Sequence, residues 1–373
     1  MTTINSRQVC DAVMSQDKGA SLFAFASFMF NAMFSPASHT PSSTPPSPFW
    51  LSPASAFGSV SSYLSIFDIS VNRLWFPTFP TLVLGLIAVY MASNALSRRA
   101  LNHGTRSSFD WSRELVLITG GAGGIGGRTA QKLAQQGTQV VVIDVMPLSY
   151  KKPSNLHYYK CDVGSYEKLQ ETAAKITRDL GNPTVIIANA AVCRGKTLLK
   201  ASKKDIELTF GVNTLGLLWT IKSFLPHLVA HNHGHILIMG SQTGYHTSVG
   251  GADYSATKAA AVSIYEGVHT ELKHSYNAPA VRLSLIKPSH VQTNMFTGIK
   301  KVPGMASVTA DYVADEIVSV LHRGDSQNKF VPASISFTPW LRVFPEWLRI
   351  ALQDMTSSAF ENLKPHDPMG KAS

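Results

Sequence analysis

The chain of 373 residues carries 33 Lys and Arg against 23 Asp and Glu, a formal net charge of +10, and 45% of its residues are hydrophobic. This apolar content suffices for a sizeable core and excludes a globally disordered chain. The positive balance suits an anionic membrane surface or nucleic acid. No run of five or more basic residues occurs, so we do not expect nucleic acid as a partner.

The cysteines argue against two kinds of stabilising site. Cys10, Cys161 and Cys193 are widely spaced and odd in number. That pattern predicts neither a disulfide framework nor a zinc site. We therefore expect the folded part to face a reducing compartment.

Residues 1–75 read as a low-complexity region. No charged residue lies between Lys18 and Asp68, and residues 39–57 are rich in Ser and Pro, a composition that does not build a packed core. Residues 20–34 form an apolar run shorter than the roughly 20 residues that a membrane-spanning helix needs. This run is either an interfacial segment or a weak signal-like region, and its flanks do not predict cleavage.

Residues 76–97 are uncharged, rich in leucine and long enough to cross a bilayer. Arg98 and Arg99 follow directly, which predicts that the next domain lies on the cytoplasmic side. A buried core helix is the alternative. Pro77 and Pro80 could shorten the helix at its start, so a membrane hairpin or monotopic insertion also remains open.

From Glu114 onward, short apolar runs alternate with amphipathic helical stretches. We expect strands at residues 115–118, 139–143, 184–188, 235–239 and 280–286 and near Phe330, with helices at 124–136, 166–180, before Asn213, around Tyr254 and at 310–321. Strands interleaved with helices imply right-handed crossovers and a parallel sheet that is covered on both faces. We predict one Rossmann-type, doubly wound α/β domain over residues 110–334, followed by an amphipathic tail at 335–373.

The loop between the first strand and its helix, residues 119–126, reads Thr-Gly-Gly-Ala-Gly-Gly-Ile-Gly. Glycines let the backbone approach a pyrophosphate, and the helix N-terminus favours the anion. Asp144 ends the second strand 18 residues beyond Gly126, where a ribose-binding acid belongs. Because an acid there repels a 2′-phosphate, we predict NAD rather than NADP, although Lys151 and Lys152 keep NADP open.

Tyr254 and Lys258 stand four residues apart in a helix-favouring segment, so their side chains share one face. An ammonium beside a phenol favours phenolate, which makes the pair an acid/base device. Ser241 lies 13 residues before Tyr254 and directly after an apolar strand, where a loop can bring its hydroxyl to the tyrosine.

Together these motifs resemble the short-chain dehydrogenase/reductase family over about residues 112–330. Asn189-Ala190-Ala191 is similar to the family's Asn-Asn-Ala-Gly motif, with Ala188 and Ala191 as departures. The segment from Pro288 to Thr293 resembles its Pro-Gly-x-Val-x-Thr segment, with Ser289 in place of glycine. For cofactor binding the resemblance implies Gly120, Gly124, Ile125, Gly126, Asp144, Asp162, Val163, Asn189, Tyr254, Lys258, Val291 and Thr293.

The resemblance also assigns a catalytic tetrad, Asn213, Ser241, Tyr254 and Lys258. In that scheme Ser241 hydrogen-bonds the substrate oxygen and Tyr254 exchanges its proton. Lys258 lowers the pKa of the tyrosine and contacts the nicotinamide ribose, while Asn213 holds a helix backbone and a water in a proton relay.

Residues 294–298 and the N-terminal membrane segment resemble the branch that holds membrane-associated retinol dehydrogenases and lipid-droplet hydroxysteroid dehydrogenases. This implies a lipophilic alcohol or carbonyl substrate. It also implies an endoplasmic reticulum or lipid-droplet membrane with the catalytic domain facing the cytosol. Homodimers that form through the Tyr254 helix are common in the family and are expected here. The alternative is a catalytically silent, cofactor-binding membrane scaffold.

Three further features leave alternatives. We expect no metal at the cluster of His227, His231, His233 and His235, because no Cys or acid joins it in the sequence. Cys193 either lines the substrate entrance or packs as a small residue. Residues 340–352 mix aromatics, leucines and arginines, and either lie in a membrane interface or cover the substrate cleft.

Overall fold

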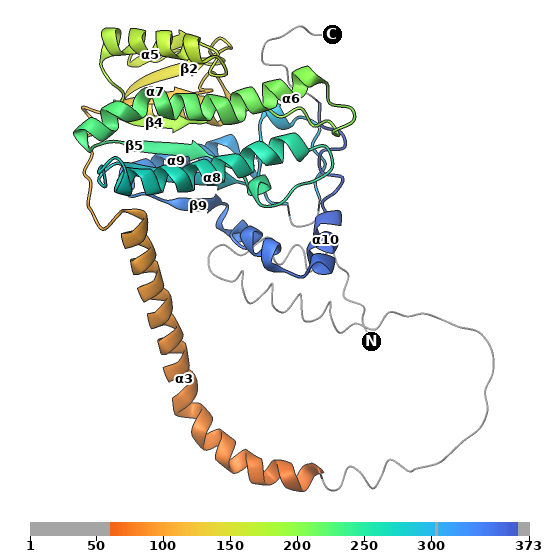
Figure 1. Ribbon diagram of the computed structural model, residues 1–373. Coiled ribbons are helices and arrows are strands. Elements are labelled where there is room, and N and C mark those ends of the chain that lie inside the picture. Colours follow the sequence, from red (N-terminus) through yellow and green to blue (C-terminus); the bar gives the residue numbers. More distant parts are fainter. Residues whose placement is uncertain (1–59, 303–304, 365–373) are drawn as a thin grey trace, which may run out of the picture. The chain divides into compact units, whose positions relative to one another are not determined.

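The computed structural model describes residues 60–302 and 305–364, with side chains from residue 80 onward (Figure 1). The chain divides into two compact units, Met1–Tyr90 and Met91–Ser373. Within the described residues the first unit consists of the N-terminal part of one long helix, and the apolar run at 20–34 lies outside them. The second unit holds the sheet.

Seven parallel strands form the sheet in the order β3-β2-β1-β4-β5-β6-β9. Their bounds are Leu115–Thr119 (β1), Gln139–Asp144 (β2), Leu156–Lys160 (β3), Val185–Ala188 (β4), His235–Met239 (β5), Arg282–Pro288 (β6) and Asn328–Val331 (β9). The order reverses direction between β1 and β4. In such sheets ligands bind beyond the carboxyl ends of the strands at that reversal.

Helices cover both faces of the sheet (Figure 1). One face is packed by α5 (Tyr166–Leu180), α7 (Gly216–His231) and α8 (Ala252–His274), and the other by α4 (Gly124–Gln135) and α9 (Ala310–Arg323). Strands β1, β4, β5 and β6 are buried along their whole length. A parallel sheet with two covered faces needs continuous apolar strands of this kind, so the predicted doubly wound fold is confirmed.

The helix α3 runs from Val60 to Leu101, so it starts well before residue 76 and passes through Pro77 and Pro80. The expectation that these prolines shorten the helix was therefore wrong. Within α3, Pro80–Leu101 is long and apolar enough to cross a membrane, and none of it is buried in the protein. The assignment of this helix as a candidate membrane span rests on its length and composition.

A fully buried arginine fixes the chain that follows α3. Nη1 of Arg282 donates to the Asn102 carbonyl at 3.1 Å, and Nη2 donates to the Thr105 carbonyl at 3.1 Å. The Asn102 side chain in turn accepts a hydrogen bond from the Ser326 amide at 2.8 Å. Because buried carbonyls need such donors, Arg282 holds residues 102–105 against the start of β6.

Several elements differ from the sequence-based expectation. Strand β3 was missed because Leu-His-Tyr-Tyr-Lys is an edge strand with one fully buried residue. Strand β6 lies two residues later than predicted. Two short strands, His290–Gln292 (β7) and Ser307–Thr309 (β8), pair in a separate sheet. After the domain end expected at Ser334 come three helical pieces, Ala333–Ile335 (η5), Thr338–Val343 (η6) and Glu346–Asp354 (α10).

Candidate active site

The glycine-rich loop joins β1 to α4 and needs its glycines. Gly120 and Gly124 have φ of +66° and +55°, the left-handed region that favours glycine. A Cβ on Gly126 would lie 2.3 Å from the Gly120 carbonyl oxygen, so no other residue fits there. No side chain caps the N-terminus of α4, and its first turn holds no acid. The loop thus offers backbone amides to an anion, as a dinucleotide pyrophosphate requires.

Asp144 lies beside this loop at the end of β2. Its two carboxylate oxygens each accept one backbone hydrogen bond, from Ala122 at 2.9 Å and from Met146 at 2.9 Å. These two bonds orient the carboxylate, and a carboxylate has further acceptor capacity for ribose hydroxyls. Asp144 therefore stands where the sequence predicted a ribose-binding acid.

Asn189 directly follows β4, and its side chain forms hydrogen bonds with the start of the glycine-rich loop. Its amide nitrogen donates to the carbonyls of Thr119 at 3.0 Å and Gly120 at 2.9 Å. The Thr119 hydroxyl accepts from the Asn189 and Ala190 amides. Asn189 therefore shapes the glycine-rich loop, and its amide nitrogen is already engaged by two carbonyls.

The remaining predicted cofactor residues lie around the same edge of the sheet. Asp162 follows β3 and accepts a hydrogen bond from the Gly164 amide, and Val163 is buried next to it. Val291 is buried in β7. A Cβ on Gly124 would meet the Thr293 methyl at 3.8 Å, so Thr293 faces the glycine-rich loop across the site. Ile125, in the first turn of α4, is partly buried and packs against the hydrophobic core.

Ser241, Tyr254 and Lys258 meet at the carboxyl end of β5. Ser241 follows the strand, and its hydroxyl accepts hydrogen bonds from the amide and hydroxyl of Thr243. Tyr254 and Lys258 lie in the first two turns of α8, and Lys258 Nζ donates to the Met239 carbonyl at 2.9 Å. All three are nearly buried, with exposed fractions of 6%, 4% and 5%.

Burial dominates the titration of this pair. It raises the pKa of Tyr254 far above the ordinary value near 10; Cys193 adds to the rise, and a hydrogen bond with Ser241 opposes it. Burial also lowers the pKa of Lys258 to about 8. Lys258 Nζ lies 5.7 Å from the Tyr254 ring centre. The predicted lowering of the tyrosine pKa by Lys258 stays a prediction.

Asn213 lies in a π-helical turn, Gly211–Leu215 (η2), between α6 (Lys203–Phe210) and α7. Its carboxamide accepts from the Val192 amide at 2.7 Å and donates to the Val192 carbonyl at 2.9 Å and to Thr257 Oγ1 at 3.0 Å. A π turn inserts one extra residue into a helix and often marks a functional position. Here it ties the end of β4 to the turn of α8 that carries Lys258.

A small cavity of about 10 Å³ separates Asn213 from Lys258, and its lining includes Thr119, Val163 and Met239. That space is close to the minimum for one water molecule, and its polar walls supply hydrogen-bond partners.

The four clustered histidines at positions 227, 231, 233 and 235 contact other side chains of the fold. His227 and His231 contact each other on the outside of α7, with ring centres 4.1 Å apart. His233 pairs with Glu114, and His235 bonds the Ser284 hydroxyl at 2.8 Å. Within residues 80–302 and 305–364, no group of three or more His, Cys, Asp or Glu is placed to hold a metal.

The family profile described as short chain dehydrogenase matches residues 114–303, just over half of the chain. The chain belongs to this family. It is therefore an oxidoreductase of the kind that acts on alcohol or carbonyl groups. The predicted family is confirmed.

Its relatives include retinol and hydroxysteroid dehydrogenases. It is 36% identical to Dehydrogenase RED2 of Cochliobolus heterostrophus over 203 residues, 54% of this chain and 77% of that one. It is 28% identical to human Epidermal retinol dehydrogenase 2 (62% of this chain, 78% of that one) and 30% identical to rat Estradiol 17-beta-dehydrogenase 11 (62% and 80%). It covers 65% of bovine Short-chain dehydrogenase/reductase 3, somewhat less than two thirds.

A solved structure supports the fold. The 3-ketoacyl-(acyl-carrier-protein) reductase from Brucella melitensis, complexed with NADH, is 19% identical with a TM-score of 0.52, over 61% of this chain and all of that one.

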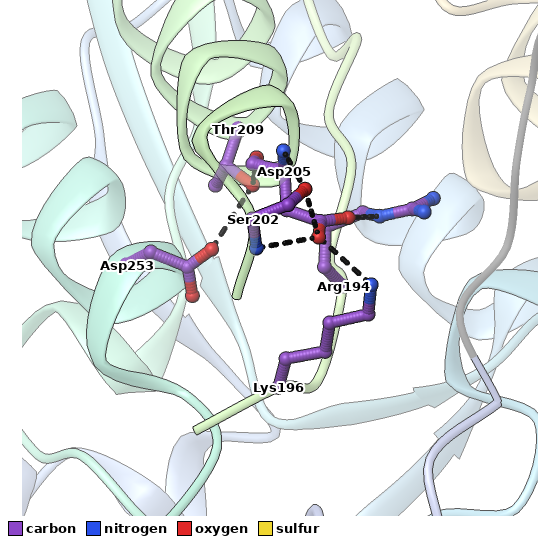
Figure 2. A network of polar contacts seen from close by, with 6 residues as sticks. All are labelled: Arg194, Lys196, Ser202, Asp205, Thr209 and Asp253. Atoms are coloured by element: carbon purple, nitrogen blue, oxygen red, sulfur yellow. Dashed lines mark hydrogen bonds and ion pairs between the residues drawn. The ribbon is translucent and has the colours of Figure 1, made fainter. Parts of the chain in front are cut away.

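A charged network that the sequence did not predict lies next to the site (Figure 2). Asp205, 4% exposed at the start of α6, binds Arg194 at 2.7 Å and Lys196 at 2.8 Å. Asp205 and Ser202 also form a capping box at the helix N-terminus. The capping pattern Ser-x-x-Asp was visible in the sequence, but the pairing with the loop after β4 was not.

The same network reaches the catalytic helix. The Thr209 hydroxyl forms hydrogen bonds with the Asp205 carbonyl and the Asp253 carboxylate (Figure 2). The Asp253 carboxylate also accepts a hydrogen bond from the Tyr254 amide. The Asp205 carboxylate therefore fixes the loop at residues 194–196. The Asp205 backbone carbonyl and Thr209 form a separate link to the first turn of α8.

We expect Asp205→Asn to destabilise the folded protein by about 3 kcal/mol at pH 7, because two basic side chains lose a buried partner. Burial tends to raise the pKa of Asp205, but bonds from Lys196, Ser202 and Arg194 together hold it well below its usual value. A depressed carboxylate pKa stabilises the fold above the unfolded pKa near 4 and loses that effect as the pH falls.

The difference between the wild type and Asp205→Asn should accordingly shrink as the pH falls from 6 through the range below 4, measured by urea unfolding at each pH. Asp354→Asn, on the exposed end of α10, is the control and should change little. A constant difference across this range would contradict the role of the charge.

Proposed function

We propose that this protein is a membrane-associated dehydrogenase that interconverts a lipophilic alcohol and its carbonyl, with Tyr254 as the proton-exchanging group. The proposal depends on the close grouping of three side chains at the carboxyl end of β5, namely Ser241, Tyr254 and Lys258. A hydroxyl, a phenol and an ammonium placed together in a nearly buried site suit proton exchange at a carbinol oxygen.

Each side chain has a task that its position supports. Ser241 ends β5 and can hold the substrate oxygen, while Tyr254 exchanges the proton with that oxygen. A bound nicotinamide supplies the hydride chemistry at the adjacent carbon. The phenol of Tyr254, kept neutral by burial, is the form that donates a proton when a carbonyl is reduced. Lys258 and Asn213 border the small cavity through which a water can relay protons.

The surroundings of Tyr254 favour a lipophilic substrate. Tyr254 belongs to an apolar cluster with Cys193, Val302, Ala359, Phe360 and Leu363, against which Met295, Phe296, Ile299 and Met305 pack. The Phe296 ring meets the Tyr254 ring edge-on at 6.0 Å between centres. Apolar walls with few polar groups bind a hydrophobic molecule and fix its orientation only at the reacting oxygen.

We further propose that NAD is preferred to NADP. Asp144 is oriented by two backbone amides, so its carboxylate stays directed at the position of the ribose. A negative charge there accepts hydrogen bonds from two hydroxyls and repels a phosphate.

The membrane part of the proposal rests on α3. Pro80–Leu101 is exposed along its length and ends with Arg98 and Arg99. Basic residues after an apolar span keep the following domain on the cytoplasmic side. Together with the similarity to a retinol dehydrogenase and an estradiol dehydrogenase, this suits an endoplasmic reticulum or lipid-droplet membrane, with the catalytic domain in the cytosol.

Replacing Tyr254 by Phe should lower turnover by about a thousandfold or more, the usual range for loss of a general acid/base. Cofactor binding should persist, because the glycine-rich loop is untouched. The measurement is nicotinamide absorbance with a panel of retinoid, steroid and long-chain alcohols and carbonyls. Tyr276→Phe, an exposed tyrosine just beyond the same helix, should stay active. Undiminished turnover in Tyr254→Phe would refute the mechanism. A wild type that binds cofactor and turns over no substrate would favour the scaffold.

Replacing Asp144 by Asn keeps the shape and removes the charge. The preference for NADH over NADPH should fall by about tenfold or more, equivalent to about 1.4 kcal/mol, in paired fluorescence titrations. Asp311→Asn on α9 serves as the control because this exposed carboxylate lies outside the loop. Tighter NADPH than NADH binding by the wild type would overturn the assignment.

The full-length protein should remain in the membrane pellet after an alkaline carbonate wash, because a 22-residue apolar helix does not leave a bilayer without disruption. Replacing both Leu84 and Val89 by Arg should move much of it to the supernatant, since each charge costs about 2.5–3.5 kcal/mol at the centre of a span. Leu199→Arg, at a fully exposed site in the second unit, is the control. Release of the wild type by the wash would exclude a spanning helix.

A further inference from the structure

The segment after α10, Thr356–Lys364, lies directly over the proposed catalytic tyrosine. Ala359, Phe360 and Leu363 are buried in one cluster with Tyr254 and Cys193. Residues up to Asn362 form successive turns without a helix or strand. We call Thr356–Lys364 the strap. It occupies the place from which an apolar substrate would reach Tyr254.

One side of the strap is attached to the chain that follows Thr293. The Lys300 amide donates to the Ala359 carbonyl at 2.9 Å, and the Lys364 amide donates to the Thr297 carbonyl at 2.9 Å. Between these two bonds the Phe360 ring meets the Phe296 ring at 6.5 Å between centres, nearly edge-on. Residues 296–300, which contact the strap, directly follow Thr293, and Thr293 faces the glycine-rich loop.

The other side of the strap rests on the loop between Ser241 and Tyr254. His246 Nε2 and the Thr356 hydroxyl lie 2.6 Å apart, within hydrogen-bonding distance. A Cβ on Gly251 would lie 3.3 Å from the Phe360 ring, so the missing side chain lets the ring lie close to the backbone there. The strap therefore connects the chain that follows Thr293 with the loop between Ser241 and Tyr254.

The inner end of the strap depends on the loop fixed by Asp205. A Cβ on Gly195 would lie 2.5 Å from the Leu363 side chain, so Leu363 packs directly on the backbone of that glycine. Gly195 stands between Arg194 and Lys196, both of which are bound by Asp205 (Figure 2). The ion pairs of Asp205 therefore hold the Gly195 backbone in the position on which the Leu363 side chain packs.

We propose that the strap is a removable wall of the substrate site: it has to detach for a substrate to enter, and Phe360 and Leu363 then select the substrate by its apolar bulk. With the strap in place Tyr254 and Ser241 are only 4% and 6% exposed, and Ala359, Phe360 and Leu363 pack in one cluster with Tyr254. The inference rests on the proposed role of Tyr254. It adds the residues that control access and specificity.

The attachments of the strap suit reversible opening. It is joined to its walls by hydrogen bonds at Thr356, Ala359 and Lys364. An ion pair between Lys300 and Glu361 at 3.5 Å adds to them, and both of its side chains are more than half exposed. Exposed pairs of this kind contribute little to stability. Most of the attachment is therefore the burial of three apolar side chains, which an apolar substrate can replace.

Cys193 provides a readout that needs no turnover. It is fully buried below the strap, and burial raises the pKa of its thiol to about 12, so a thiol reagent reaches it only when the site opens. Labelling of Cys193 by a maleimide, followed by peptide mass spectrometry on the full-length protein, measures the opening. Phe360→Ala should increase the labelling rate by about tenfold or more. Trp347→Ala, which removes an exposed aromatic ring on α10, is the matched control and should not.

A second variant guards against a folding defect. Glu361→Lys turns the exposed pair with Lys300 into a repulsion without touching the core, and should raise Cys193 labelling by about threefold at low salt and less at high salt. Glu361→Gln, which only removes the attraction, should change it less. Wild-type labelling rates in both Phe360→Ala and Glu361→Lys would overturn the proposal.

Substrate selection supplies the final test. Phe360→Ala and Leu363→Ala should each raise the ratio of kcat/KM for a polycyclic alcohol to that for cyclohexanol by about tenfold, while NADH binding stays unchanged. Labelling is also measured in Tyr254→Phe, where turnover falls by about a thousandfold on the proposed mechanism. Undiminished turnover in Tyr254→Phe contradicts the proposed function; an unchanged substrate ratio, with Tyr254 still required for turnover, contradicts the strap proposal alone.

Discussion

The ammonium of Lys258 is held inside the domain by the carbonyl that ends β5, and the rest of the site depends on this contact. A buried ammonium needs a hydrogen-bond acceptor at a fixed position, and a strand end supplies one. Since Lys258 and Tyr254 share one face of α8, the bond to Met239 also places the phenol at the same strand end as Ser241. Three separate segments are thereby brought to one edge of the sheet.

Rigidity around this edge comes from polar groups that satisfy backbone atoms. Asn189 fixes the glycine-rich loop, Asn213 joins the end of β4 to α8, and Asp205 holds the loop after β4 while Thr209 connects it to Asp253. Each is a buried or half-buried side chain whose hydrogen bonds cross between elements. Such bonds are expensive to leave unmade, so they keep the groups of the site within a narrow range of positions.

Apolar contacts act differently on the opposite side of the site. The strap Thr356–Lys364 packs on Tyr254 through Ala359, Phe360 and Leu363, with few hydrogen bonds to its walls. Apolar burial is non-directional, so one hydrophobic group can replace another at modest cost. The polar side of the site is therefore fixed, whereas the apolar side suits exchange between the strap and a substrate.

The sequence alone determined the parallel α/β fold, the glycine-rich loop, Asp144 and the positions of Tyr254 and Lys258. These features depend on spacing within one element or across one turn, which a linear pattern records. Only the tertiary structure decided that Asp205 binds Arg194 and Lys196, that burial raises the pKa of Tyr254, and that Phe360 packs in one cluster with Tyr254. Those outcomes depend on contacts between segments far apart in the chain and on exclusion of water, which local sequence does not encode.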